Sequence, residues 1–112
     1  MIYDYKGFNE NVLTFPAVGT LAAGNPVAIS AEGAAVASAN SDFIGICTGV
    51  ADGVATVQVS GYVEVKATGI ANYGYNGIAS NSTNGVKKYD NAVRKAYVIK
   101  IDSTKGTVGF IL

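Results

Sequence analysis

Hydrophobic and polar residues alternate with a period of two along much of this chain. The clearest run extends from Val57 to Lys66 and reads VQVSGYVEVK. Its four valines would lie on one face of an extended strand, and its Gln, Ser, Tyr, Glu and Lys on the other. The run therefore predicts a β-strand with one buried face. Gly61 in its middle indicates a bulge or a bend, as at the corner of a barrel.

Shorter runs of the same kind predict further strands, separated by residues that favour turns. We expect these strands at 26–30, 34–37, 43–50, 96–102 and 107–112. Each of the connections 31–33, 51–53 and 103–106 contains a Gly and predicts a tight turn. Closely spaced short strands with such turns predict an all-β fold, either a small β-barrel or a sandwich.

Three segments lack the alternation. Residues 1–15 are rich in aromatic and aliphatic side chains without a clear period, and predict an N-terminal arm ahead of a single β domain at 16–112. Residues 70–85 contain Asn-Gly pairs, which favour positive backbone angles, and predict turns. Residues 90–96 are compatible with a couple of helical turns at most.

Composition narrows the classes of partner. The chain has 112 residues, eight basic and eight acidic, and charged residues make up 14% of it, against roughly 25% in an average soluble domain. This neutrality argues against nucleic acid as a partner, because phosphate binding needs a surplus of Lys and Arg. The basic cluster at 87–95, with Tyr89 and Tyr97 beside it, is the best candidate for such binding, but a solvated edge or an interface rim is favoured for it.

The charges are also unevenly distributed. Residues 1–56 contain five acids and one Lys, a formal charge of −4, whereas residues 57–112 contain seven bases and three acids, a formal charge of +4. The two halves could pair within one fold, or between neighbouring subunits in a head-to-tail ring. We favour pairing within the fold.

No catalytic, cofactor-binding or metal-binding residues are predicted. The chain has no His, the commonest general base and metal ligand. Cys47 is the only cysteine, so it has no partner for an internal disulfide, and we expect it to be a small buried residue. Residues 72–77 resemble a Gly-rich nucleotide loop only superficially. We therefore expect a protein that is not an enzyme and needs no cofactor.

The sequence also lacks the usual signals for membranes and export. No stretch approaches the ~18 consecutive apolar residues of a membrane span. The first residues have no basic start followed by an apolar run of signal-peptide length. We therefore expect no membrane partner and synthesis in the cytoplasm.

Several short motifs occur in an order that resembles the small capsid decoration proteins of tailed phages and prophages. Residues 18–29, VGTLAAGNPVAI, resemble the opening of that family, and FIGIC at 43–47 and VQVSGYV at 57–63 follow in the same order. Residues 99–108 are similar to the family's terminal hairpin, and residues 1–15 look like its N-terminal segment in some prophage versions. The resemblance covers nearly the whole chain.

This resemblance implies a structural role on the virion. Such proteins bind the outside of an expanded icosahedral head, often as trimers, and stabilise it against internal DNA pressure. They commonly adopt a small β-barrel or β-tulip fold. The implied partners are the lattice of the major capsid protein and further copies of this chain in a homotrimer. The implied location is the capsid exterior, after synthesis in the bacterial host cytoplasm. Alternatives are another virion or prophage module (tail, fibre or head completion) and a carbohydrate-binding β module.

Residues 1–15 are the expected capsid contact. Such an arm can order on a lattice by adding a strand or by filling apolar grooves. Tyr3, Tyr5 and Phe8 are the expected anchors, because aromatic side chains anchor many interfaces. The alternative for the latter part of the arm is a first strand in the core that contains Val12, Leu13 and Phe15.

Overall fold

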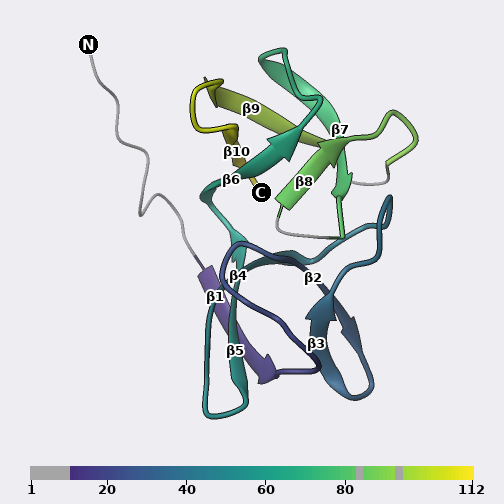
Figure 1. Cartoon of the computed structure of the whole chain (residues 1–112), viewed down its shortest axis with the longest axis vertical. Helices are drawn as coiled ribbons and strands as arrows, with labels where there is room; N and C mark the ends of the chain where they lie inside the picture. Colours follow the sequence, from purple (N-terminus) through teal and green to yellow (C-terminus); the bar gives the residue numbers. More distant parts are fainter. Residues whose placement is uncertain (1–10, 83–84, 93–94) are drawn as a thin grey trace.

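The computed structural model describes residues 11–82, 85–92 and 95–112, and its regular structure there is entirely β (Figure 1). This confirms the predicted all-β class. The strands are β1 (Asn11–Pro16), β2 (Pro26–Ser30), β3 (Gly33–Val36), β4 (Gly45–Ala51), β5 (Val54–Ser60), β6 (Tyr62–Thr68), β7 (Gly74–Ser80), β8 (Gly85–Lys88), β9 (Lys95–Asp102) and β10 (Thr107–Ile111). Their bounds lie within two residues of the strands predicted at 26–30, 34–37, 43–50, 96–102 and 107–112.

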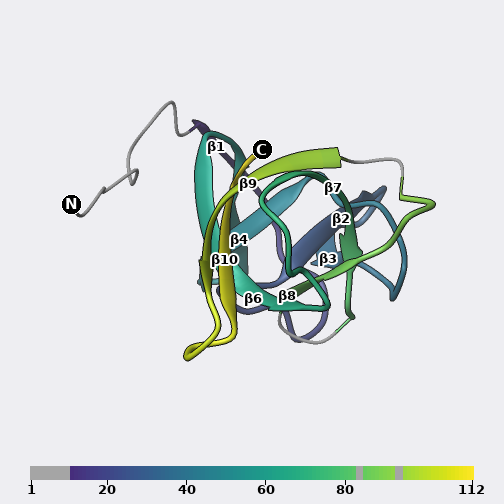
Figure 2. The same cartoon turned by 90° about the horizontal axis from the view of Figure 1, so that it is seen from above.

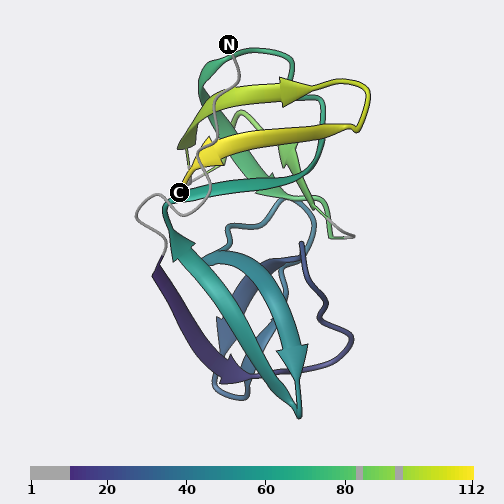
Figure 3. The same cartoon turned by 90° about the vertical axis from the view of Figure 1, so that its left-hand side faces the viewer.

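The strands form two sheets that lie one above the other (Figures 1 and 3). The first is a five-stranded sheet with the order β1-β5-β4-β2-β3, and the second is a closed barrel with the order β10-β6-β8-β7-β9. Neighbouring strands are antiparallel except β6 and β8, which are parallel. Seen from above, β9 and β10 lie side by side in one wall of the barrel (Figure 2).

Gly61 joins the two sheets. The run from Val57 to Lys66 splits here, so that β5 ends in the five-stranded sheet and β6 begins in the barrel. Gly61 has a φ of 92°, in the left-handed region that favours glycine, which confirms the predicted bend. The neighbours of this bend depart from the alternation, because the two sheets meet there. Gln58 and Tyr62, both on the predicted polar face, are only 6% and 3% exposed.

Two apolar clusters stabilise the fold. The larger consists mostly of barrel residues, including the fully buried Phe110, and is joined by residues of β4 and of the β3–β4 connection. Its buried members are Ala37, Phe43, Ile46, Val63, Val65, Ile70, Ile78, Val86, Ala96, Val98, Val108 and Phe110. The smaller lies in the five-stranded sheet and contains no fully buried aromatic ring; its buried members are Leu21, Val27, Ala34, Cys47, Ala55 and Val57. Cys47 is thus a small buried residue, as expected.

The turns predicted throughout residues 70–85 are wrong for much of that segment, because β7 occupies residues 74–80. The Asn76-Gly77 pair lies inside this strand. The Asn76 side chain points back to the preceding turn, where its Nδ2 donates to the carbonyl oxygens of Asn72 and Gly74, at 3.0 Å each. Asn76 therefore stabilises a turn that precedes it instead of forming one itself.

The helical turns considered for residues 90–96 are also wrong. Residues 90–91 form a turn, closed by a 3.0 Å hydrogen bond from the Ala92 amide to the Tyr89 carbonyl, and β9 begins at Lys95. Residues 93–94 lie outside the described ranges.

The strand β1 is the outermost strand on one side of the five-stranded sheet. It pairs with β5 along its whole length, from Asn11 opposite Ser60 to Pro16 opposite Val54. The latter part of the predicted arm therefore forms a first strand, which was the alternative prediction for it. Most apolar residues of this strand, however, do not lie in the core. Val12 and Leu13 are 52% and 49% exposed. The strand order places no strand outside β1, and its open edge ends at Ala17, which forms a bridge with Ala34 of β3. Only Phe15 packs partly against the smaller cluster.

Candidate interaction surface

The five-stranded sheet has no charged residue in any of its strands. Its acids, Glu32, Asp42 and Asp52, all lie in connecting loops, and residues 11–60 contain no Lys or Arg. The barrel differs: its strands carry Glu64, Lys66, Lys87, Lys88, Lys95, Lys100 and Asp102. Removing an uncharged surface from water costs much less than removing a charged one, so the five-stranded sheet is the better docking surface.

Its edge strand β1 is the most accessible part of this uncharged surface. Soluble proteins usually protect sheet edges with charged side chains, prolines or bulges. On β1 this protection is limited to an irregular register at Asn11–Val12 and to Pro16 at the end of the strand. Between them lie Val12 and Leu13, whose side chains are exposed. An edge of this kind can accept an additional strand or contact an apolar groove of a partner.

The anchors predicted from the sequence precede this edge. Tyr3, Tyr5 and Phe8 lie outside the described residues, which begin at Asn11. The start of β1 is fixed at the junction of the two sheets, where Asn11 Nδ2 donates to Ser60 Oγ at 2.8 Å. The C-terminal end of the barrel is at the same place, because the Leu112 amide donates to the Gly61 carbonyl at 2.9 Å.

A second candidate surface lies on the barrel. Tyr75 on β7 is paired with Tyr97 on β9, and their rings meet edge to face with centroids 4.9 Å apart. Both are unusually exposed for aromatic residues, at 76% and 46%. With Lys95, Ile111 and Leu112 they line an open groove of about 400 Å³, which we call the tyrosine groove.

Sequence reasoning missed the tyrosine groove. It placed Tyr75 in a turn and Tyr97 on a strand beside a basic cluster, so that the two rings were not considered as a pair. In the barrel, β7 lies between β8 and β9 and separates the Lys87-Lys88 pair from Lys95. The signal that could have located the groove is the alternation at 95–98, where an exposed Lys and Tyr alternate with a buried Ala and Val.

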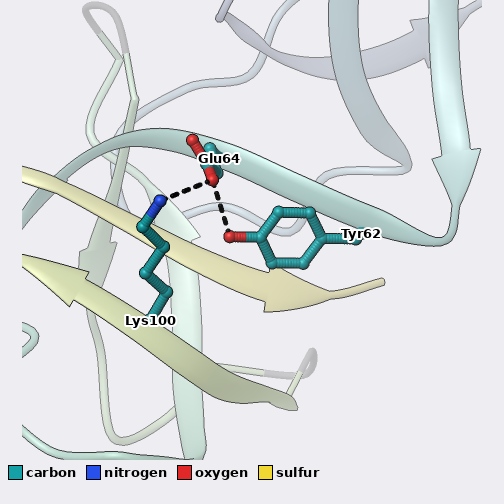
Figure 4. Close-up of polar contacts among 3 residues, drawn as sticks. All are labelled: Tyr62, Glu64 and Lys100. Atoms are coloured by element: carbon teal, nitrogen blue, oxygen red, sulfur yellow. Dashed lines mark hydrogen bonds and ion pairs between the residues drawn. The ribbon is translucent and has the colours of Figure 1, made fainter. Parts of the chain in front are cut away.

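A network of polar side chains lies at the junction of the two sheets (Figure 4). The Tyr62 hydroxyl donates to Glu64 Oε1 at 2.8 Å, and Lys100 Nζ donates to the same oxygen at 3.2 Å. Glu64 and Lys100 both lie opposite Gly109 of β10, one on each side. The Tyr62 ring occupies the space that a side chain at position 109 would need, so only glycine allows this arrangement.

Gln58 completes the junction. Its Nε2 donates to the carbonyl oxygens of Ser60 and Tyr62, at 3.1 and 2.9 Å, across the bend at Gly61. A cavity of about 560 Å³ opens beside these residues and is also lined by Cys47 and Thr48. Because Gln58 is committed to bonds across the bend, and Glu64 to bonds with Tyr62 and Lys100, these side chains have a structural role at the junction.

The described residues offer little for catalysis or metal binding. Burial raises the pKa of the Cys47 thiol above its ordinary value, so this group is not an activated nucleophile. Within the described ranges, no three His, Cys, Asp or Glu residues gather as metal ligands would. The same ranges contain no helix long and apolar enough to cross a membrane.

Comparisons with known proteins add no relative. No protein-family model matches the chain, and no curated protein or solved structure is significantly similar to it. What the protein does is therefore inferred from its surfaces and from the order of its sequence motifs.

Proposed function

We propose that this protein is a structural component of a phage virion that binds the outer surface of the capsid and stabilises the head. The observation that carries this proposal is the uncharged five-stranded sheet, whose edge strand β1 exposes Val12 and Leu13. The order of the motifs at 18–29, 43–47 and 57–63 supports the choice of partner, the lattice of the major capsid protein.

The contact would extend from residues 1–10 into β1. Complete burial of an aliphatic side chain stabilises a complex by about 1.5–3 kcal/mol, so covering the half-exposed Val12 and Leu13 contributes about 1 kcal/mol each. Tyr3, Tyr5 and Phe8 would add aromatic anchors ahead of them. One chain with these contacts would bind weakly, but the three chains of a homotrimer on a symmetric lattice would bind more tightly, because the first contact raises the effective concentration for the others.

Stabilisation of the head follows from selective binding. A protein that binds the expanded lattice, and not its disassembled subunits, stabilises each site by about 2.7 kcal/mol when its concentration is 100 times its Kd. In this role the chain is made in the bacterial cytoplasm and resides on the capsid exterior.

Co-sedimentation with expanded heads that lack this protein tests the proposal. We expect the wild-type chain to pellet with such heads to a saturable stoichiometry. The double variant Val12→Lys/Leu13→Lys should lose most of this binding, because two desolvated charges would face the lattice. Tyr73→Lys is the matched control, since it places a charge at an exposed apolar position next to the barrel strand β7 and should bind normally.

A deletion tests the part of the arm ahead of β1. It must stop at residue 10, because β1 pairs with β5 and its removal would strip the five-stranded sheet of an edge strand. Deleting residues 2–10 should weaken head binding and leave the circular dichroism spectrum of the fold unchanged. Full binding by this deletion and by the double Lys variant would contradict the proposed contact.

A further inference from the structure

We propose that this chain associates head to tail, with the β4–β5 hairpin of one copy docked into the tyrosine groove of a second copy. The hairpin tip comprises residues 50–54, and the groove is the one lined by Tyr75, Lys95, Tyr97, Ile111 and Leu112. This contact does not depend on binding to a capsid.

The hairpin tip presents apolar side chains beside a carboxylate. Asp52 and Gly53 have φ values of 52° and 75°, and two successive positive values are characteristic of a tight two-residue hairpin turn. Val50 and Val54 precede and follow this turn, and both are exposed. The tip therefore combines two valines with one exposed acid, in a rigid hairpin that loses little conformational freedom on binding.

The tyrosine groove has the complementary composition. Tyr75 and Tyr97 offer large apolar surfaces, and the exposed Lys95 lies in the same groove. Aromatic residues in a pocket are typical anchors of protein interfaces, and a Lys beside them would meet the Asp52 carboxylate. A valine of the tip would fill the groove between the rings and Leu112.

Within the described ranges, the charges of the two sheets do not pair with one another. Between residues that the structure describes, the one ion pair joins Lys100 to Glu64, and both belong to the barrel. The pairing of the two halves within the fold, which the sequence favoured, is therefore not seen in the described part of the chain. Among those residues the acids of the five-stranded sheet have no basic partner, an arrangement that is compatible with pairing between copies.

The hairpin cannot reach the groove of its own chain. The tyrosine groove ends at Leu112, which is hydrogen-bonded to Gly61 at the junction. The hairpin tip lies at the other end of β5, away from the barrel (Figure 1). The seven residues of β5 span roughly 20 Å at a rise of about 3.3 Å per residue. A hairpin that occupies the groove must therefore come from a second copy, and repetition of this contact gives a ring or a filament.

Sedimentation velocity over a concentration series from micromolar to about 500 µM tests this contact. We expect reversible association of the wild-type chain that weakens as salt is raised, because charges take part in it. Asp52→Lys and Lys95→Glu should each weaken association by at least about ten-fold, since each places like charges together. Combining both substitutions in one chain should restore association to within about three-fold of wild type.

Lys105→Glu is the matched control for Lys95→Glu, because it makes the same charge change in the exposed β9–β10 turn, away from the groove. It should associate like wild type. Thermal unfolding of every variant confirms that the fold is intact. A strictly monomeric wild-type chain would overturn the proposed contact, and so would equal effects of Lys95→Glu and Lys105→Glu. A third combination of results would also overturn the proposed contact: association lost on deleting residues 2–10 but unchanged by Asp52→Lys. It would assign the tyrosine groove to residues 2–10 instead.

Discussion

The five-stranded sheet and the closed barrel are built from similar short strands and tight turns, yet they differ in charge and in packing. The barrel contributes most of the larger apolar cluster, including the fully buried Phe110, and carries charges on its strands. The five-stranded sheet packs six mostly small buried residues and has uncharged strands. We infer from this difference that the barrel contributes most of the stability, whereas the five-stranded sheet offers the surface that a partner can cover.

The largest expected effect is a loss of unfolding free energy in the barrel, and it tests whether the barrel contributes more stability than the five-stranded sheet. Phe110→Ala should lower the free energy of unfolding by about 3–5 kcal/mol, because it leaves a cavity at a fully buried position in the barrel. Phe15→Ala removes the same side chain from the edge strand of the five-stranded sheet, where it is only partly buried, and should cost about 1 kcal/mol. Urea titrations of both variants measure the difference. Equal losses of unfolding free energy in the two variants would contradict the inference that the barrel contributes most of the stability.

Gly109→Ala tests the junction between the two regions. The new methyl group would collide with the Tyr62 ring, so we expect a loss of about 1–3 kcal/mol in unfolding free energy. The control is Gly49→Ala, where a Cβ meets no atom within 4 Å and φ is not positive. Thermal unfolding should separate the two variants clearly. If both were equally stable, the Tyr62 ring could not be held against Gly109 as described.

The hydrogen bond from Tyr62 to Glu64 should contribute less. Tyr62→Phe keeps the buried ring and removes only the hydroxyl, so we expect a loss of about 1 kcal/mol. Lys100→Met should cost less still, because the Lys100–Glu64 ion pair is partly exposed to solvent. A double-mutant cycle between Tyr62→Phe and Glu64→Met, which removes the accepting oxygens, measures the coupling. Strictly additive effects would rule out a stabilising bond.

A further expected effect is a dependence of stability on pH that arises in the five-stranded sheet. Burial raises the pKa of the Cys47 thiol in the folded state, while in the unfolded chain the thiol ionises at its ordinary pKa of about 8.5. As the pH rises, the thiol therefore loses its proton at a lower pH in the unfolded state than in the folded state. The contribution of Cys47 to stability is complete below the pKa of the unfolded state and is lost as the pH rises above it.

Cys47→Ala removes this titration and serves as the comparison. Between pH 8.5 and 9.5, wild type should lose stability relative to the variant, by at most about 1.4 kcal/mol per pH unit. Parallel stability curves for the two proteins over this range would show that the thiol is not buried in the folded sheet.

Much of the fold could be predicted because its signals are local. The alternation of Val57 to Lys66 and the glycine-containing turns locate strands without knowledge of the tertiary fold. The bend at Gly61 could be predicted for the same reason. That this bend separates two sheets could not, because it depends on which distant strands pair with β5 and β6. Gln58 and Tyr62 are buried by that long-range arrangement, although their positions in the alternation are polar.

The candidate surfaces were harder to predict than the strands. Asn76-Gly77 resembles a turn in sequence, but the Asn76 side chain bonds to an earlier turn and leaves Tyr75 on a strand beside Tyr97. The tyrosine groove depends on that cross-strand pairing, which no local pattern specifies. The uncharged character of residues 11–31 is visible in the sequence, but its meaning as an exposed edge requires the strand order.

The most direct test of the central proposal is a cryo-EM reconstruction of expanded heads saturated with this protein. We predict density on the outer capsid surface in which β1 of the five-stranded sheet faces the lattice and the charged strands of the barrel face solvent. Heads that carry no such density, or density in which the barrel contacts the capsid while β1 is exposed, would contradict it.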